Sequence, residues 1–102
     1  MALKAKLFDP ADYLTDDESI FEYLRLALEE NDPHEIVRSL SDVARARGGV
    51  SQLAKETGLS SEVLETSLSK TGNPDLATLM RILQVFGIKL TVSNAVSEPV
   101  AA

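Results

Sequence analysis

The sequence predicts a mainly α-helical domain of five helices with a short C-terminal strand, all within residues 1–92. Three observations favour this fold class. Apolar residues recur at helical spacing in several segments, most of these segments lie between a capping residue and a glycine, and one late segment alternates with the period of a strand. With 102 residues and 44% hydrophobic content, the chain is long enough for one domain with a modest core.

Residues 1–14 are expected to form an N-terminal extension, followed by two helices within residues 15–47. Asp9-Pro10 interrupts any helical period in the extension, whereas Leu3–Leu7 alternates apolar residues with lysines as a short strand does. Thr15 and Glu18 have the spacing of a capping box, which begins a first helix that extends to about Glu30. Its apolar face is predicted to comprise Ile20, Phe21, Leu24, Ala27 and Leu28.

The second helix is expected to begin at Asp32-Pro33, because aspartate caps a helix and proline suits a first position that needs no N–H donor. Gly48 ends this helix, since a left-handed glycine commonly follows the last helical turn. Tyr13 and Tyr23 are most simply residues at the edge of the core. The buried stripe of the second helix is predicted to comprise Ile36, Val37, Leu40, Val43 and Ala44.

Residues 49–70 have the most informative spacing in the chain. A helix of about two turns, Val50–Thr57, is expected to stop at Gly58, and Ser60 caps a second helix from Ser61 to about Lys70. A small residue, Ala54, lets the two helices cross closely. The inward residues are predicted to be Leu53, Leu59, Val63, Leu64 and Leu68. This layout is typical of a helix-turn-helix, whose second helix enters the major groove of DNA, and the competing interpretation is an ordinary pair of packed helices.

Residues 75–86 are expected to form the last helix, with Asp75 as its cap, Gly87 after its end, and an apolar face of Leu79, Ile82, Leu83 and Phe86. Ile88–Val92 alternates with period two and predicts the C-terminal strand. Because one short strand is not stable alone, its partner is Leu3–Leu7, the same strand of a second subunit, or a different protein. Residues 93–102 are expected to form a flexible tail.

The net charge of −6 is unusual for a protein that binds nucleic acid, but the charge is unevenly distributed. Residues 1–35 contain three cations and ten anions, whereas residues 36–70 contain five cations and four anions. The acidity of the first third indicates a separate partner for that part of the chain. A solubilising helix face explains the same charge equally well.

The run Gln52-Leu53-Ala54, followed by Gly58-Leu59-Ser60, resembles the lambda-repressor/Cro-type helix-turn-helix. The wider pattern over about residues 8–92 is similar to that of addiction-module antidote proteins, antitoxins related to the HigA group. The resemblance implies a lambda-repressor-like antitoxin that binds and neutralises a small basic RelE/HigB-like ribonuclease toxin and, as a homodimer, represses their shared operon. The other matching segments are Phe8-Asp9, Tyr13-Leu14, Tyr23-Leu24, 27–30, 40–48, Leu68-Ser69, 72–74 and 87–92.

The docking geometry of a helix-turn-helix predicts which residues face operator DNA. The side chains toward base edges are Ser61, Glu62, Glu65 and Thr66. Gln52 and Lys55 lie toward the DNA backbone, and Lys70 lies near the far end of the second helix. Arg47 is also expected to contact DNA, and Arg45 is a further cation nearby. In the family, basic and aromatic residues are frequent near positions 62, 65 and 66, whereas residues 61–69 here contain two glutamates and no cation. Because phosphate contacts supply much of the affinity, weak binding by a monomer is expected, strengthened by dimerisation or by the charge of the toxin.

No enzymatic, metal or cofactor site is predicted. His34, the only histidine, fits a surface position in the first turn of a helix, and helix capping accounts for Asp16-Asp17-Glu18 without a metal. Gly48-Gly49 lacks the lysine and hydroxyl of a phosphate-binding loop, and the chain has no cysteine. No signal peptide and no apolar run of about 18 residues is found, so a cytoplasmic protein without a membrane partner is expected.

Three functions follow from these observations. The first is an antitoxin whose helix-turn-helix binds operator DNA and whose acidic N-terminal part or C-terminal strand binds the toxin. The second is a stand-alone transcriptional repressor. The third is an interaction module in which the helix-turn-helix is only structural.

Overall fold

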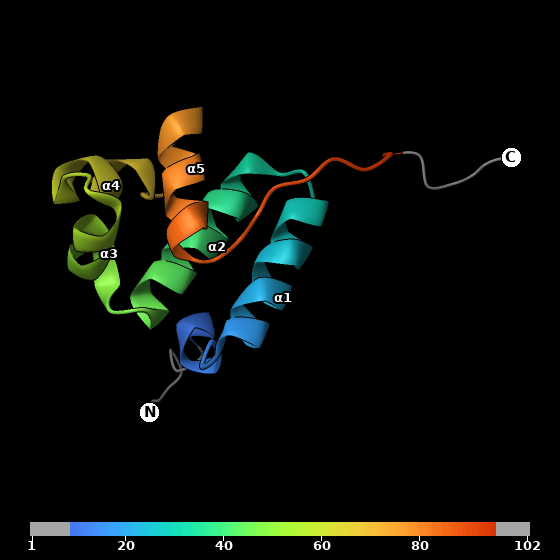
Figure 1. Cartoon of the computed structure of the whole chain (residues 1–102), viewed down its shortest axis with the longest axis horizontal. Helices are drawn as coiled ribbons and strands as arrows, with labels where there is room; N and C mark the ends of the chain where they lie inside the picture. The colour runs from blue at the N-terminus through green and yellow to red at the C-terminus, as the bar shows by residue number, and fades with distance from the viewer. Residues whose placement is uncertain (1–8, 96–102) are drawn as a thin grey trace, which may run out of the picture.

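Five α-helices and one short 3-10 helix form the regular structure of the computed structural model, which describes residues 9–95 (Figure 1). The elements in chain order are η2 (Pro10–Tyr13), α1 (Asp17–Glu29), α2 (Pro33–Ala46), α3 (Gly49–Thr57), α4 (Ser61–Ser67) and α5 (Leu76–Val85). The prediction of a mainly α-helical chain is therefore confirmed, and the arrangement is compatible with a helix-turn-helix type of domain.

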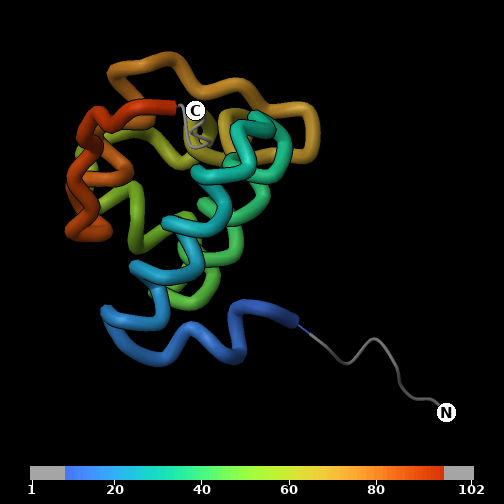
Figure 2. The backbone as a smooth tube through the Cα atoms, turned by 90° about the vertical axis from the view of Figure 1, so that its right-hand side faces the viewer, coloured from blue at the N-terminus to red at the C-terminus, as the bar shows by residue number. Residues whose placement is uncertain are grey.

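Helix α2 is central to the packing. It contacts η2, α1 and α3, and α3 in turn contacts α4 and α5. In both views α1 and α2 lie side by side (Figures 1 and 2), and in Figure 1 α3 and α4 lie on the side of α2 that faces away from α1. Burial of an aliphatic side chain contributes about 1.5–3 kcal/mol, so apolar packing is the main stabilising term. The core comprises Leu14, Ile20, Leu24, Val37, Leu40, Val43, Ala44, Leu53, Leu64, Leu68, Ile82, Leu83 and Phe86.

Side-chain caps begin four of the five α-helices, and those of Asp32, Ser60 and Asp75 are confirmed. The predicted Thr15–Glu18 capping box is wrong. Asp16 instead accepts the Ser19 N–H at 2.8 Å, and the Ser19 hydroxyl accepts the Asp16 N–H at 3.2 Å. A carboxylate one residue later thus reaches the unpaired N–H groups of the first turn, and this backbone hydrogen bond lowers the pKa of Asp16.

The expected strand at Ile88–Val92 is wrong, because residues 9–95 contain no β-strand. A strand requires a paired edge, and no residue from 89 to 95 makes a backbone hydrogen bond to another described residue. The segment instead leaves α5 and runs toward the far side of α1 (Figure 1). The proposed partner strand Leu3–Leu7 lies outside the described residues, as do residues 96–102 of the expected tail.

Two residues predicted to face the core are at the surface. Phe21 on α1 is 49% exposed and Val63 on α4 is 44% exposed. Each helix packs through a narrower stripe than the pattern predicted: α1 uses Ile20 and Leu24, and α4 uses Leu64. Tyr13, expected at the edge of the core, is likewise largely exposed.

Two element boundaries also differ from the prediction. Asp9-Pro10 starts the short helix η2 rather than only interrupting a helix, because the Asp9 carboxylate accepts the Ala11 N–H at 3.1 Å. Helix α4 ends at Ser67 instead of near Lys70. The chain turns back tightly after it, since a Cβ at Gly72 would lie only 2.1 Å from the carbonyl oxygen of Ser67.

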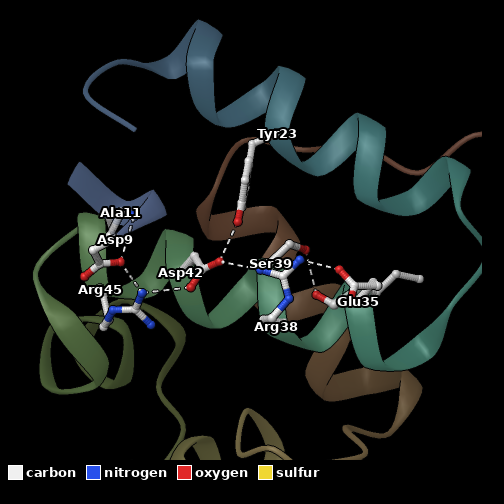
Figure 3. A network of polar contacts seen from close by, with 9 residues as sticks. Asp9, Ala11, Tyr23, Glu35, Arg38, Ser39, Asp42 and Arg45 are labelled. Atoms are coloured by element: carbon white, nitrogen blue, oxygen red, sulfur yellow. Dashed lines mark hydrogen bonds and ion pairs between the residues drawn. The ribbon is translucent and has the colours of Figure 1, made fainter. Parts of the chain in front are cut away.

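A buried carboxylate, Asp42 of α2, joins three parts of the chain (Figure 3). Its side chain is 6% exposed. The Tyr23 hydroxyl of α1 donates to Asp42 Oδ2, and Arg45 Nη2 donates both to Asp42 Oδ1 at 2.8 Å and to Asp9 Oδ1 at 2.6 Å. Arg38 lies 3.5 Å from the same carboxylate. These donors offset the cost of removing the charge from water.

The Tyr23–Asp42 contact is sensitive to alkaline pH. Burial, followed by the hydrogen bond to Asp42, raises the pKa of Tyr23 to about 12. Because the folded pKa lies above that of an unfolded tyrosine, about 10, the stabilising effect is complete below pH 10. It is then lost as the pH rises from about 10 to about 12.

Tyr23→Phe removes the hydroxyl and is expected to lower the free energy of unfolding at pH 7 by about 1–2 kcal/mol, since it removes one hydrogen bond to a charged group. Chemical denaturation at pH 7, 10 and 11.5 tests this, and wild type should approach the stability of the variant as the pH rises. In a double-mutant cycle, the loss in Tyr23→Phe/Asp42→Asn should be smaller than the sum of the single losses. Additive losses would show that the contact contributes nothing.

Candidate nucleic-acid interface

The turn between α3 and α4 is fixed by Thr57 and Gly58. Thr57 is buried, and its hydroxyl donates to the Leu53 carbonyl at 2.8 Å and accepts the Leu59 N–H at 3.2 Å. Gly58 has a φ of 79°, a left-handed conformation that costs other residues about 1–2 kcal/mol. The two residues thus turn the chain within a few positions, and α4 packs against α3.

Helix α5 supports this turn. Arg81 Nη1 donates to the Thr57 carbonyl oxygen at 2.8 Å, which provides a partner for a C-terminal carbonyl of α3 that the helix leaves unpaired. Sequence reasoning missed the role of Arg81, because the contact spans 24 positions and no local pattern indicates it. The hydroxyl of Thr57, just before Gly58, is a local signal of a capped turn.

The four residues predicted to meet base edges are all exposed on α4. They are Ser61, Glu62, Glu65 and Thr66. Beneath them Leu64 and Leu68 enter the core, so α4 has one buried face and one open face. Val63, which was expected to be buried, also lies at the surface, where an apolar group could contact a thymine methyl.

Three of the remaining predicted residues are exposed near α4, whereas Arg47 is not part of the same surface. Gln52 and Lys55 are exposed on α3, and Lys70 is exposed just after α4. The amide of Gln52 donates to Glu56 at 3.3 Å, which leaves both side chains at the surface. We refer to the seven exposed candidates on these two helices and the following turn as the α3–α4 surface: Gln52, Lys55, Ser61, Glu62, Glu65, Thr66 and Lys70.

Arg47 does not belong to the α3–α4 surface. Its guanidinium lies over the ring of Phe86, 5.8 Å from the centroid, and 3.9 Å from Asp17 of α1. The Arg47 Nε is buried without a hydrogen-bond partner among the described residues. Arg45 is engaged as well, by Asp9 and Asp42. Both arginines therefore serve contacts within the fold.

Few cations remain near α4. From Gly49 to Lys70 the chain has two lysines, Lys55 and Lys70, against three glutamates, Glu56, Glu62 and Glu65. Neither lysine forms an ion pair with another residue in the described range. A phosphate backbone would meet two available lysines and two glutamates on the face of α4, an electrostatic balance that disfavours strong binding.

The described part of the chain shows neither a metal site nor a membrane-spanning helix. His34 is exposed in the first turn of α2. Residues 9–95 contain no group of three or more side chains that could hold a metal ion. None of the helices within this range has the length and apolar character needed to cross a membrane.

A family model described as "Probable addiction module antidote protein" matches residues 4–94. The chain belongs to this family. Membership in the antidote family implies a cognate toxin as partner. Proteins of the antidote family are generally not enzymes.

A relative supports the assignment over nearly the whole chain. An uncharacterized protein of Haemophilus influenzae is 39% identical over 95 residues, which cover 93% of this chain and 97% of the relative. No solved structure shows a significant match to the chain. The relationship to the HigA group and to lambda-repressor-like domains stays a prediction.

The placement of the cations predicts different effects of two substitutions. Arg47→Ala is expected to lower the free energy of unfolding by about 1 kcal/mol, because it removes the contact with Phe86 and the packing of the aliphatic stem. Lys55→Ala should change it by less than about 0.5 kcal/mol, since the side chain lies at the surface. Urea denaturation of both variants tests the distinction. Equal stability of the two variants would contradict the structural role of Arg47.

Proposed function

We propose that the chain is the antitoxin of a type II toxin–antitoxin module, which binds and neutralises a RelE/HigB-like ribonuclease toxin and represses the shared operon through the α3–α4 surface. Membership in the antidote family supports the antitoxin role and favours it over a stand-alone repressor. Such a protein acts in the cytoplasm, where its RNA-cutting partner and operon are found.

The observation that carries the DNA-binding part is the pairing of a short α3 with an exposed α4 across the turn at Gly58. A helix with one face in the core and the other open can enter a major groove. Its serine and threonine can contact several bases, and a glutamate can accept from the N4 group of cytosine. Lys55 on α3 and Lys70 just after α4 supply contacts to the DNA phosphates.

Dimerisation is part of the proposal, because a pair of lysines gives a monomer little affinity for phosphates. Two copies related by a two-fold axis would place their α4 helices in successive major grooves, about 34 Å apart. Each half-site then adds its contacts to those of the other. The operator is accordingly expected to be an inverted repeat.

A second candidate function is favoured by the same charges. Glu62 and Glu65 on the open face of α4 oppose phosphates, which suits a protein that binds the toxin and retains the helix pair only as scaffold. The two functions differ in one measurable property, which is the salt-dependent binding of DNA from upstream of the gene.

A mobility-shift titration with that DNA at several salt concentrations distinguishes them. If the α3–α4 surface binds DNA, Lys55→Ala and Lys70→Ala should each weaken binding. Each should reduce the slope of log K against log salt by about 0.9 per lysine lost, which is about 1.8 for a dimer that loses one lysine in each copy. Glu62→Gln/Glu65→Gln should strengthen binding, because it removes two charges that repel phosphates.

Lys89→Ala is the matched control, since Lys89 is an exposed lysine on the C-terminal segment and lies outside the α3–α4 surface. For this variant, the slope of log K against log salt should equal that of wild type. Absence of any shift at about 50 mM salt, with the dimer confirmed by sedimentation, would exclude the repressor role and leave the scaffold function.

A further inference from the structure

An open groove is lined by α1 and the C-terminal segment. Both segments lie on the side of α2 that faces away from α3 and α4 (Figure 1). One wall is formed by Phe21, Arg25, Leu28 and Glu29 of α1, and the other by residues 88–95. We call this feature the α1 groove. Phe21 is half-exposed at its wall, and Val92 is 98% exposed on the opposite side. Large apolar side chains left open beside a groove mark an interaction surface.

The C-terminal wall has unpaired backbone. The Ile88 N–H donates to Leu83 at 2.9 Å, but no backbone hydrogen bond joins residues 89–95 to any other described residue. Ile88, Leu90 and Val92 alternate with polar residues as they do in a strand. The segment therefore has the sequence of a strand without its partner, and an extended chain could pair with it in the way that peptides add to a sheet edge.

The helix beside the groove is negative, while the C-terminal wall carries one cation, Lys89. Residues 16–30 contain six carboxylates and one cation, Arg25, which is already paired with Glu22 at 2.8 Å and Glu29 at 3.2 Å. A second copy docked symmetrically would place two such acidic faces against each other. A basic partner would instead be attracted, and its association would be accelerated by the opposite charge.

We infer that the α1 groove is where the antitoxin holds its toxin, a basic RNA-binding protein that pairs an extended segment with residues 88–92 and places an apolar side chain beside Phe21. This inference rests on the proposed antitoxin function and assigns its binding surface. The acidic carboxylates of α1 meet cations that the toxin uses to bind RNA, so the bound toxin loses access to its substrate. The toxin surface and the α3–α4 surface then lie on different parts of the molecule.

The test uses the full chain and the small basic ribonuclease-like protein encoded beside its gene, with binding measured by surface plasmon resonance. Glu29→Lys/Glu30→Lys should lower the association rate about tenfold and reduce its salt dependence, because opposite charges govern encounter. Lysines at the C-terminal end of a helix suit its dipole, so α1 should remain folded. The matched control is Glu62→Lys/Glu65→Lys on α4, which should leave toxin association within about twofold of wild type.

The apolar and backbone contacts are tested by the dissociation rate. Phe21→Ser should raise it about tenfold, while Val63→Ser, an equally exposed apolar position on α4, should not. Leu90→Pro and Thr91→Pro each remove one N–H, and successive N–H groups of an extended chain point to opposite edges. At least one of them should therefore weaken binding about tenfold if the segment pairs with the toxin. Thermal melts confirm that each variant is folded.

The outcomes separate the inference from the function on which it depends. If wild type does not bind the toxin, the proposed antitoxin function falls. If wild type binds and the α1 and proline variants bind equally well, only the α1 groove assignment falls. Loss of binding in the α4 variants alone would place the toxin on the α3–α4 surface. If Phe21→Ser converts a toxin-free dimer into monomers, the groove is an interface between copies and the inference is overturned.

Discussion

The buried carboxylate of Asp42 is the interaction on which the rest of the structure depends. A charge with 6% exposure must be surrounded by donors, and α1, α2 and the segment before η2 each contribute to the network around it. The Tyr23 hydroxyl fixes α1 on α2, which leaves the acidic side of α1 facing outward. Arg38 pairs with Glu35 and Asp42, and Arg45 pairs with Asp9 and Asp42. These two cations are therefore not available to bind a partner elsewhere on the surface.

This use of the arginines explains the weak electrostatics of the α3–α4 surface. Of the cations that the sequence places near residues 49–70, Arg45 pairs with carboxylates and Arg47 packs on Phe86, so Lys55 and Lys70 remain. The helix pair itself is well supported, through Thr57, Gly58 and the bond from Arg81. Shape and charge therefore disagree on this surface: the shape suits a DNA groove, whereas the balance of two lysines against Glu62 and Glu65 disfavours strong binding.

Sequence reasoning predicted the local features well, because caps, glycine stops and apolar periods act over a few residues. Asp32, Ser60, Asp75 and Gly58 have the predicted roles.

Sequence reasoning failed where a contact between residues far apart in the chain determines the structure. The strand at Ile88–Val92 has the right alternation, but pairing needs an edge that residues 9–95 do not supply. Phe21 and Val63 match a helical apolar period, yet no neighbouring helix covers them, and a pattern cannot show which face stays open. In the candidate site, exposure of α4 followed from the pattern, whereas the diversion of Arg45 and Arg47 depended on residues far away in the chain.

The central claim is that one small core presents two independent surfaces, α3–α4 for DNA and the α1 groove for the toxin. Sedimentation of labelled upstream DNA with the antitoxin, as purified toxin is added, tests this most directly. The account predicts a heavier species that contains DNA, antitoxin and toxin together, with the DNA retained at saturating toxin. Stoichiometric release of DNA by the toxin, with no ternary species at any ratio, would contradict it.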